Sequence, residues 1–122
     1  MFVEATLAVG EDRDEAVLAS VRAFFDSSRR FTEWKWLEPG PAIGAVTGRT
    51  LATGGERMMV VARVARPGQT ELEVTSASYP LYDWGQNRRN IQQLVRHLRE
   101  SDLVVEIEVM ISKHRLGGPK PK

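Results

Sequence analysis

The chain of 122 residues contains 42% hydrophobic and 27% charged residues and has a net charge of +1, values that are ordinary for one globular domain. This composition disfavours a disordered chain, and no apolar run approaches the roughly 20 residues that cross a membrane. The absence of cysteine excludes disulfides and thiolate metal sites. It also fits a reducing cytoplasm, where we expect the protein because the first residues carry no secretion signal.

The charges are unevenly distributed along the chain. Residues 112–122 contain four basic and no acidic residues, so the remaining 13 basic and 16 acidic residues give a net charge of −3. Gly, Pro and Lys dominate this segment and favour a flexible solubilising tail over a nucleic-acid-binding one, because four charges support only weak, salt-sensitive binding. We therefore expect a single domain over residues 1–111 and a flexible basic tail over residues 112–122.

Hydrophobic periodicity predicts a strand and then a helix at the start of the chain. Residues 2–9 alternate between apolar and mixed positions, which is typical of a strand with one buried face. From about Asp14, apolar residues recur at helical spacing, and Asp12 or Asp14 is expected to cap the helix. The apolar stripe consists of Val17, Leu18, Val21, Phe24 and Phe25.

The middle of the chain predicts four strands joined by short turns. The strands are expected at residues 31–37, 43–51, 57–66 and 70–78. Short turns between successive strands favour an antiparallel meander. Gly44 and Gly48 interrupt the second of these strands, so we expect a bulge or a close backbone approach there.

A second helix and a last strand follow. Residues 84–100 carry a buried stripe of Ile91, Leu94, Val95 and Leu98, which Trp84 and Asn87 extend. Asp83 is expected to cap this helix, with Gln86 completing a capping box. Apolar and acidic residues alternate along residues 103–111, which predicts a strand. One side of this strand would carry Val105, Ile107, Val109 and Ile111, and the other side Glu106 and Glu108.

These elements give the order β-α-β-β-β-β-α-β. Each helix has one apolar stripe and most strands have one apolar face. The simplest arrangement is a two-layer α+β domain, in which a curved antiparallel sheet carries both helices on one face.

This order resembles the TATA-binding-protein-like fold. The segment from Ser76-Ala77-Ser78 through Asp83-Trp84-Gly85-Gln86-Asn87-Arg88 is similar to a bacterial family of unknown function, whose members carry Ser-Ala-Ser and then Asp-Leu-Gly-x-Asn-Arg. Trp84 replaces the family's leucine, and Tyr79-Pro80-Leu81-Tyr82 replaces a more basic linker. The resemblance covers under half of the chain and implies a fold but no activity. The first half is also similar to START-type and plant-allergen-type ligand-binding domains, which usually end on a long helix.

Asn87 and a group of aromatic residues are the candidate binding residues. A buried amide must be hydrogen-bonded, and we favour a structural role in which Asn87 ties the helix to the backbone around Ser76 and Ser78 over a ligand contact. Several aromatic residues can line a hollow beside the start of the second helix, although they serve equally well as core. The candidate ligand-binding residues are Trp34, Trp36, Tyr79, Tyr82, Trp84 and Asn87.

No catalytic or metal site is expected. His97 is predicted on the exposed face of the second helix and His114 in the tail, and neither has a second histidine at metal-binding spacing. No nucleophile motif and no phosphate-binding loop occurs, so we expect neither an enzyme nor a cofactor.

These observations favour a protein-interaction or assembly module. The sheet face without helices is half apolar, so we expect a homo-oligomer or a protein partner there. The candidate interface residues are Phe2, Met59, Val61 and Arg63. The alternative is a carrier of a small hydrophobic ligand in the aromatic hollow. Nucleic-acid binding through the second helix and the tail is a weaker alternative, because the sheet face carries glutamates that repel phosphates.

Overall fold

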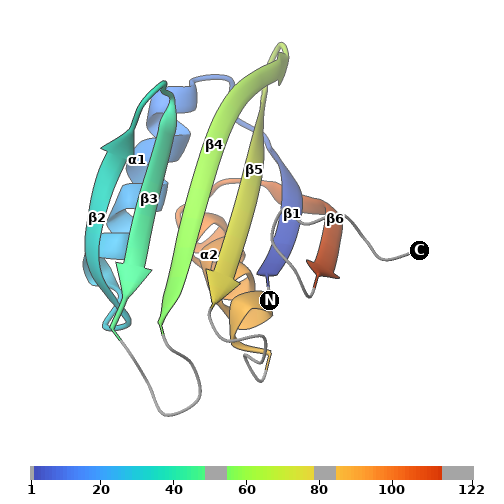
Figure 1. Cartoon of the computed structure of the whole chain (residues 1–122). Coiled ribbons are helices and arrows are strands. Elements are labelled where there is room, and N and C mark those ends of the chain that lie inside the picture. Colours follow the sequence, from blue (N-terminus) through green and yellow to red (C-terminus); the bar gives the residue numbers. More distant parts are fainter. Residues whose placement is uncertain (1, 49–54, 79–84, 114–122) are drawn as a thin grey trace.

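The computed structural model describes residues 2–48, 55–78 and 85–113, which form six strands and two helices. They follow in the order β1 (Phe2–Val9), α1 (Asp14–Ser27), β2 (Phe31–Leu37), β3 (Ala42–Thr47), β4 (Glu56–Arg66), β5 (Gln69–Ser78), α2 (Gln86–Glu100) and β6 (Val105–Lys113) (Figure 1). The predicted order of elements is confirmed. β6 continues to Lys113, two residues beyond the predicted end of the domain.

The strands form one antiparallel sheet with the spatial order β2-β3-β4-β5-β1-β6. β2 to β5 are neighbours in chain order, which confirms the predicted meander. β1 lies between β5 and β6, so that Leu7 pairs with Leu72 on one side and with Ile107 on the other. The two ends of the domain therefore lie side by side in the sheet.

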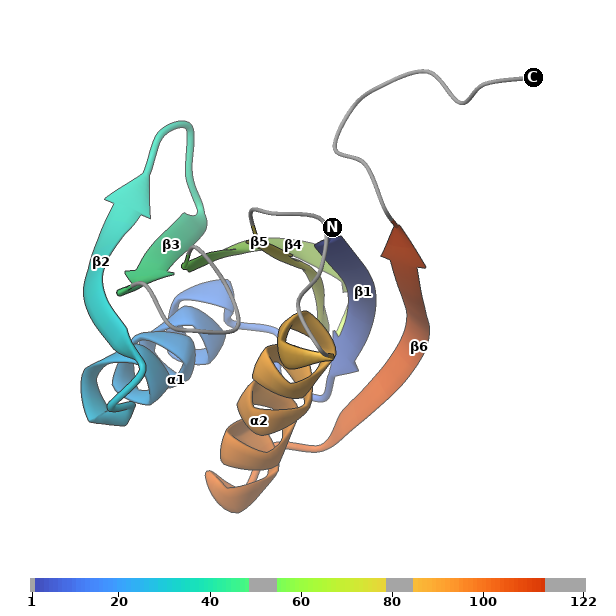
Figure 2. The same cartoon turned by 60° about the horizontal axis from the view of Figure 1, so that its bottom comes forward.

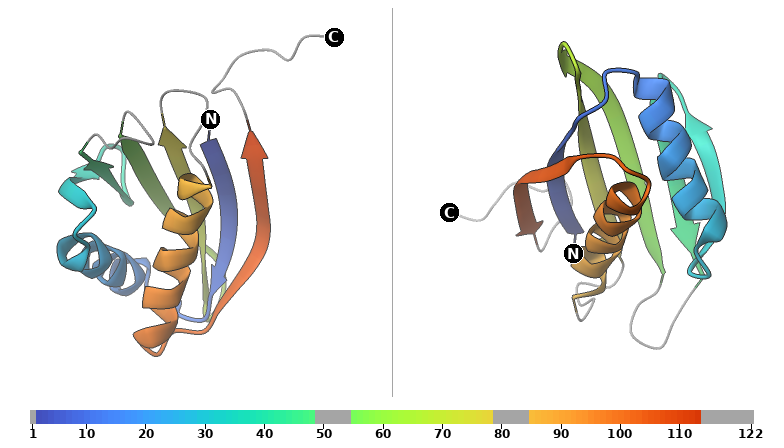
Figure 3. Two further views of the ribbon diagram at one scale, coloured as in Figure 1. Left: turned by 90° about the horizontal axis from the view of Figure 1, so that it is seen from below. Right: turned by 180° about the vertical axis from the view of Figure 1, so that it is seen from behind.

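Both helices pack on the same face of the curved sheet, as Figures 2 and 3 show. α1 contacts β2, β3 and β4, whereas α2 contacts β5, β1 and β6, and the two helices touch each other. The predicted two-layer α+β arrangement is confirmed. We call the face under the helices the inner face and the opposite one the outer face.

One hydrophobic core fills the space between the helices and the inner face. Alternate strand residues meet the predicted helix stripes there, and burial of each large apolar side chain contributes roughly 1.5–3 kcal/mol. The large apolar residues with at most 1% exposure include Leu7, Phe25, Ile43, Met58, Leu72, Ile91, Leu94 and Leu98.

The predicted cap of α1 is wrong, because Arg13, and neither Asp12 nor Asp14, occupies the N-cap position, and it makes no side-chain capping bond. α2 begins at Gln86 after Gly85. Gly85 adopts a left-handed conformation (φ 78°), which glycine tolerates without a steric cost. The side-chain amide of Gln86 donates to Asn90 Oδ1 (2.8 Å), one turn later in the same helix. Asp83 lies outside the described residues.

The predicted burial of β6 is also wrong beyond Val105. The pairing with β1 shifts between Thr6, which pairs with Val109, and Leu7, which pairs with Ile107. This bulge reverses the alternation, because it adds one residue to β6. Val109 and Ile111 therefore lie on the outer face, and Ile107, Val109 and Ile111 are 40–46% exposed. Met110 packs against the core instead.

Candidate functional site

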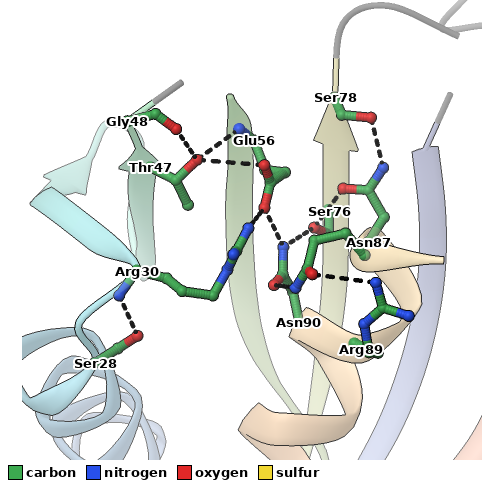
Figure 4. Close-up of polar contacts among 11 residues, drawn as sticks. Ser28, Arg30, Thr47, Gly48, Glu56, Ser76, Ser78, Asn87, Arg89 and Asn90 are labelled. Carbon is green, nitrogen blue, oxygen red and sulfur yellow. Dashed lines mark hydrogen bonds and ion pairs between the residues drawn. The ribbon is translucent and has the colours of Figure 1, made fainter. Parts of the chain in front are cut away.

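A group of hydrogen-bonded polar residues is buried on the inner face where β3 and β5 end and β4 and α2 begin (Figure 4). These residues come from the chain before β2, from three strands and from the first two turns of α2. We call this group the polar cluster; it consists of Arg30, Thr47, Glu56, Ser76, Ser78, Gln86, Asn87 and Asn90.

Glu56 is the centre of the polar cluster. Its side chain is fully buried and forms an ion pair with Arg30, whose side chain is 30% exposed. Asn90 Nδ2 donates to Glu56 Oε1 (3.3 Å). Thr47 Oγ1 accepts the backbone N–H of Glu56 (2.8 Å) and lies 3.4 Å from Glu56 Oε2. These partners offset the large cost of burying a carboxylate.

Two asparagines connect α2 to β5 within the polar cluster. The Ser76 hydroxyl donates to Asn87 Oδ1 (2.8 Å), and Asn87 Nδ2 donates to the Ser78 hydroxyl (2.9 Å). Asn90 Nδ2 also donates to Ser76 Oγ (3.2 Å). The predicted contacts of Asn87 with Ser76 and Ser78 are confirmed. Asn87 thus holds the first turn of α2 against the end of β5.

Sequence reasoning missed Arg30, Glu56 and Asn90, although two of them carried a signal. Glu56 precedes Met58 by two residues, so it shares the inward-facing side of β4. Asn90 lies three residues after Asn87 and four before Leu94, so it belongs to the buried stripe of α2. Arg30 is in a loop, where periodicity gives no information.

His97 is not on the exposed face, where it was predicted. Its ring lies 5.6 Å from that of Phe24 in α1, and its Nε2 is buried without a hydrogen-bond partner. Ser20 Oγ in α1 is likewise buried without a partner. His97 therefore belongs to the contact between the two helices.

A hollow of about 650 Å³ lies on the outer face over β2 to β5. Gly44 lies in its floor, where an added Cβ would come within 3.1 Å of Leu37 Cδ1. The neighbour is a side chain and the strand pairing is regular here, so neither the predicted bulge nor the predicted close backbone approach occurs at Gly44. The outward-facing residues that line the hollow are Glu33, Lys35, Leu37, Gly44, Val46, Arg57, Met59, Thr75 and Ala77.

Trp34 and Trp36 of β2 were predicted to line an aromatic hollow beside α2, but they lie elsewhere. Trp34 and Trp36 meet edge to face (5.6 Å between ring centroids), and Trp34 Nε1 donates to Asp26 Oδ1 (2.6 Å) in α1. β2 is separated from β5, where Asn87 is bound, by β3 and β4. Trp34 and Trp36 are therefore not brought to Asn87. Tyr79, Tyr82 and Trp84 lie outside the described residues.

The four predicted interface residues belong to the outer face, but they differ in exposure. Met59 is 45% exposed and Val61 is half-buried. Arg63 forms ion pairs with Glu71 (3.3 Å) and Glu73 on the neighbouring β5. Phe2 is only 5% exposed, and the ammonium group of Lys113 lies 5.6 Å from its ring centroid. Phe2 therefore offers little surface to a partner.

In the three described stretches of the chain, no group of three or more His, Cys, Asp or Glu residues is arranged to hold a metal ion. None of the helices in these stretches is long and apolar enough to cross a membrane.

The sequence matches none of the protein-family models and none of the curated proteins with which it was compared. The resemblance to the TATA-binding-protein-like fold and to a bacterial family of unknown function therefore stays a prediction.

Proposed function

We propose that this protein is a non-catalytic interaction module whose outer-face hollow binds an apolar segment of a partner protein. The proposal depends on one observation, the apolar hollow on the sheet face that the helices leave open. Concave apolar surfaces with a few polar groups at their rim are the usual form of a binding site.

The exposed apolar residues of the hollow are contiguous, and this distinguishes them from scattered surface residues. Val46 is 36% and Met59 is 45% exposed, and they flank Gly44, which pairs with Met59 across the strands. Single exposed apolar residues are common on soluble proteins, whereas a contiguous apolar hollow favours a partner.

The charges at the rim indicate the chemistry of the partner. Lys35 and Arg57 border the hollow, and Glu33 is the one acidic residue among the described residues that line it. No ion pair joins Lys35 or Arg57 to a carboxylate in the described residues, in contrast to Arg63 on the same face. A segment with a large apolar anchor beside an acidic residue suits this rim.

A displayed library of random peptides, selected on the immobilised protein, tests the proposal. We expect enriched peptides to carry an aromatic or large aliphatic residue beside Asp or Glu. Met59→Lys places a charge in the hollow and should weaken their binding at least about tenfold, or roughly 1.4 kcal/mol. Thr6→Lys is the matched control, because it adds the same charge to the same face outside the hollow.

Two results would contradict the proposal. A library that yields no peptide above background would show that the hollow does not bind such segments. Peptides that bind wild type and Met59→Lys with equal affinity would place their site elsewhere.

A further inference from the structure

β6 forms one edge of the sheet and pairs only with β1 among the described strands. In Figure 2 it lies at the far side of the sheet from β2. About half of the backbone N–H and C=O groups of an edge strand point away from its neighbour. Such a row of groups is a template for pairing with another strand.

Exposed apolar side chains are concentrated at this edge. Seven large apolar residues in the described parts of the chain are exposed, and four of them lie within residues 104–111. These four are Val104, Ile107, Val109 and Ile111, with exposures of 69%, 40%, 46% and 46%. No comparable concentration occurs elsewhere among the described residues, so this edge is the surface best suited to a second strand.

The opposite edge strand, β2, differs from β6 in length and in its central residues. β2 is two residues shorter than β6 and carries Lys35 near its middle. A central lysine is a common means of blocking edge pairing. Each edge strand is also tied to a helix, since Trp34 of β2 donates to Asp26 of α1 (2.6 Å) and Arg88 of α2 donates to Ser112 of β6 (3.3 Å). In β6, the stretch after the bulge, Val109–Ser112, contains no charged residue.

We propose that β6 pairs antiparallel with β6 of a second copy of this chain, which joins the two sheets into one. The charges favour this partner and this direction. Glu106 and Glu108 lie in the first half of β6, and Lys113, which also pairs with Glu4 of β1 (3.3 Å), ends it. Antiparallel pairing brings the Lys113 end of one copy beside the acidic half of the other, whereas parallel pairing would place glutamates against glutamates.

In the antiparallel dimer the Lys113 end of each copy adjoins the acidic half of the other, so opposite charges adjoin at both ends of the interface. A two-fold axis makes the two contacts identical, as expected for a homodimer.

This dimer goes beyond the proposed function, because it uses another part of the sheet. The hollow lies over β2 to β5, whereas β6 is separated from β5 by β1. Pairing at β6 therefore leaves the hollow of each copy open to its own partner. The two proposals can fail independently.

Single-cysteine cross-linking of the full chain tests the edge, since the natural sequence has no cysteine. We expect Val109→Cys or Ile111→Cys to form a covalent dimer under mild oxidation, because the two-fold axis brings one of these positions close to its own copy. Val46→Cys is the matched control, an exposed valine in the hollow. Cross-linking of Val46→Cys as fast as of both β6 variants would overturn the proposal.

Analytical ultracentrifugation supplies an independent measurement. Wild type should sediment at twice the mass of the 13.7 kDa chain. Ile111→Lys should raise the dimer dissociation constant at least about tenfold, whereas Met59→Lys should leave it unchanged. Ile111→Thr keeps a β-forming residue and serves if the lysine variant unfolds. Monomeric wild type at high concentration, or dissociation by Met59→Lys alone, would overturn the proposal.

Discussion

The polar cluster and the hollow are built from alternate residues of the same strands, and each reverses the usual distribution of polarity. In β4, Glu56 points to the inner face, while Met59 points to solvent. In β3, Thr47 points inward and Val46 outward. Glu56 has hydrogen-bond and ion-pair partners, whereas the side chains of Val46 and Met59 are 36% and 45% exposed to solvent. Buried polar groups that have partners are compatible with a stable fold, and contiguous exposed apolar groups favour binding.

The two adjacent methionines of β4 allow the sharpest test of this comparison. Met58 is 1% exposed and Met59 is 45% exposed. We expect Met58→Ala to lower the free energy of unfolding by about 2–5 kcal/mol, because it leaves a cavity in the core. Met59→Ala should lower it by less than about 1 kcal/mol. Urea denaturation followed by circular dichroism measures both, and equal losses would refute the assignment of the two faces.

Replacement of Arg30, the cation of the polar cluster, should have the next largest effect on the free energy of unfolding. Arg30→Met removes the ion pair between Arg30 and the buried Glu56 carboxylate, which should cost about 3 kcal/mol of unfolding free energy. This value is at the lower end for buried pairs because Arg30 is partly exposed. Arg63→Met is the control, since Arg63 is 56% exposed and its surface pairs contribute less than about 1 kcal/mol. A loss in Arg30→Met no larger than in this control would show that Glu56 does not need its partner.

The smallest effect is expected from the amide that joins α2 to β5. Asn87→Leu removes the acceptor of the Ser76 hydroxyl and a donor to Ser78, which should cost about 1–3 kcal/mol. Gln93→Leu changes an exposed amide of the same helix and should shift stability by less than about 0.5 kcal/mol. Thermal and urea unfolding of both variants provide the measurement. A fully stable Asn87→Leu protein would mean that packing alone positions α2.

The polar cluster on the inner face was partly predictable from the sequence. Asn87 lay on an apolar stripe close to two serines, so its hydrogen bonds followed from helical spacing. Glu56 and Asn90 lay at inward-facing positions, but they are 34 residues apart and their contact depends on the packing of α2 against the sheet. The aromatic residues were misleading, because composition does not reveal that β3 and β4 separate β2 from β5.

The order of the elements, their periods and nearly all of the core could be predicted from the sequence, because alternation and helical spacing are local properties of the chain. The folded chain was needed to show which polar residues meet Glu56, where the outer face is hollow and which side of β6 is exposed. Each of these depends on contacts between segments far apart in the chain or, in β6, on one added residue that reverses the alternation.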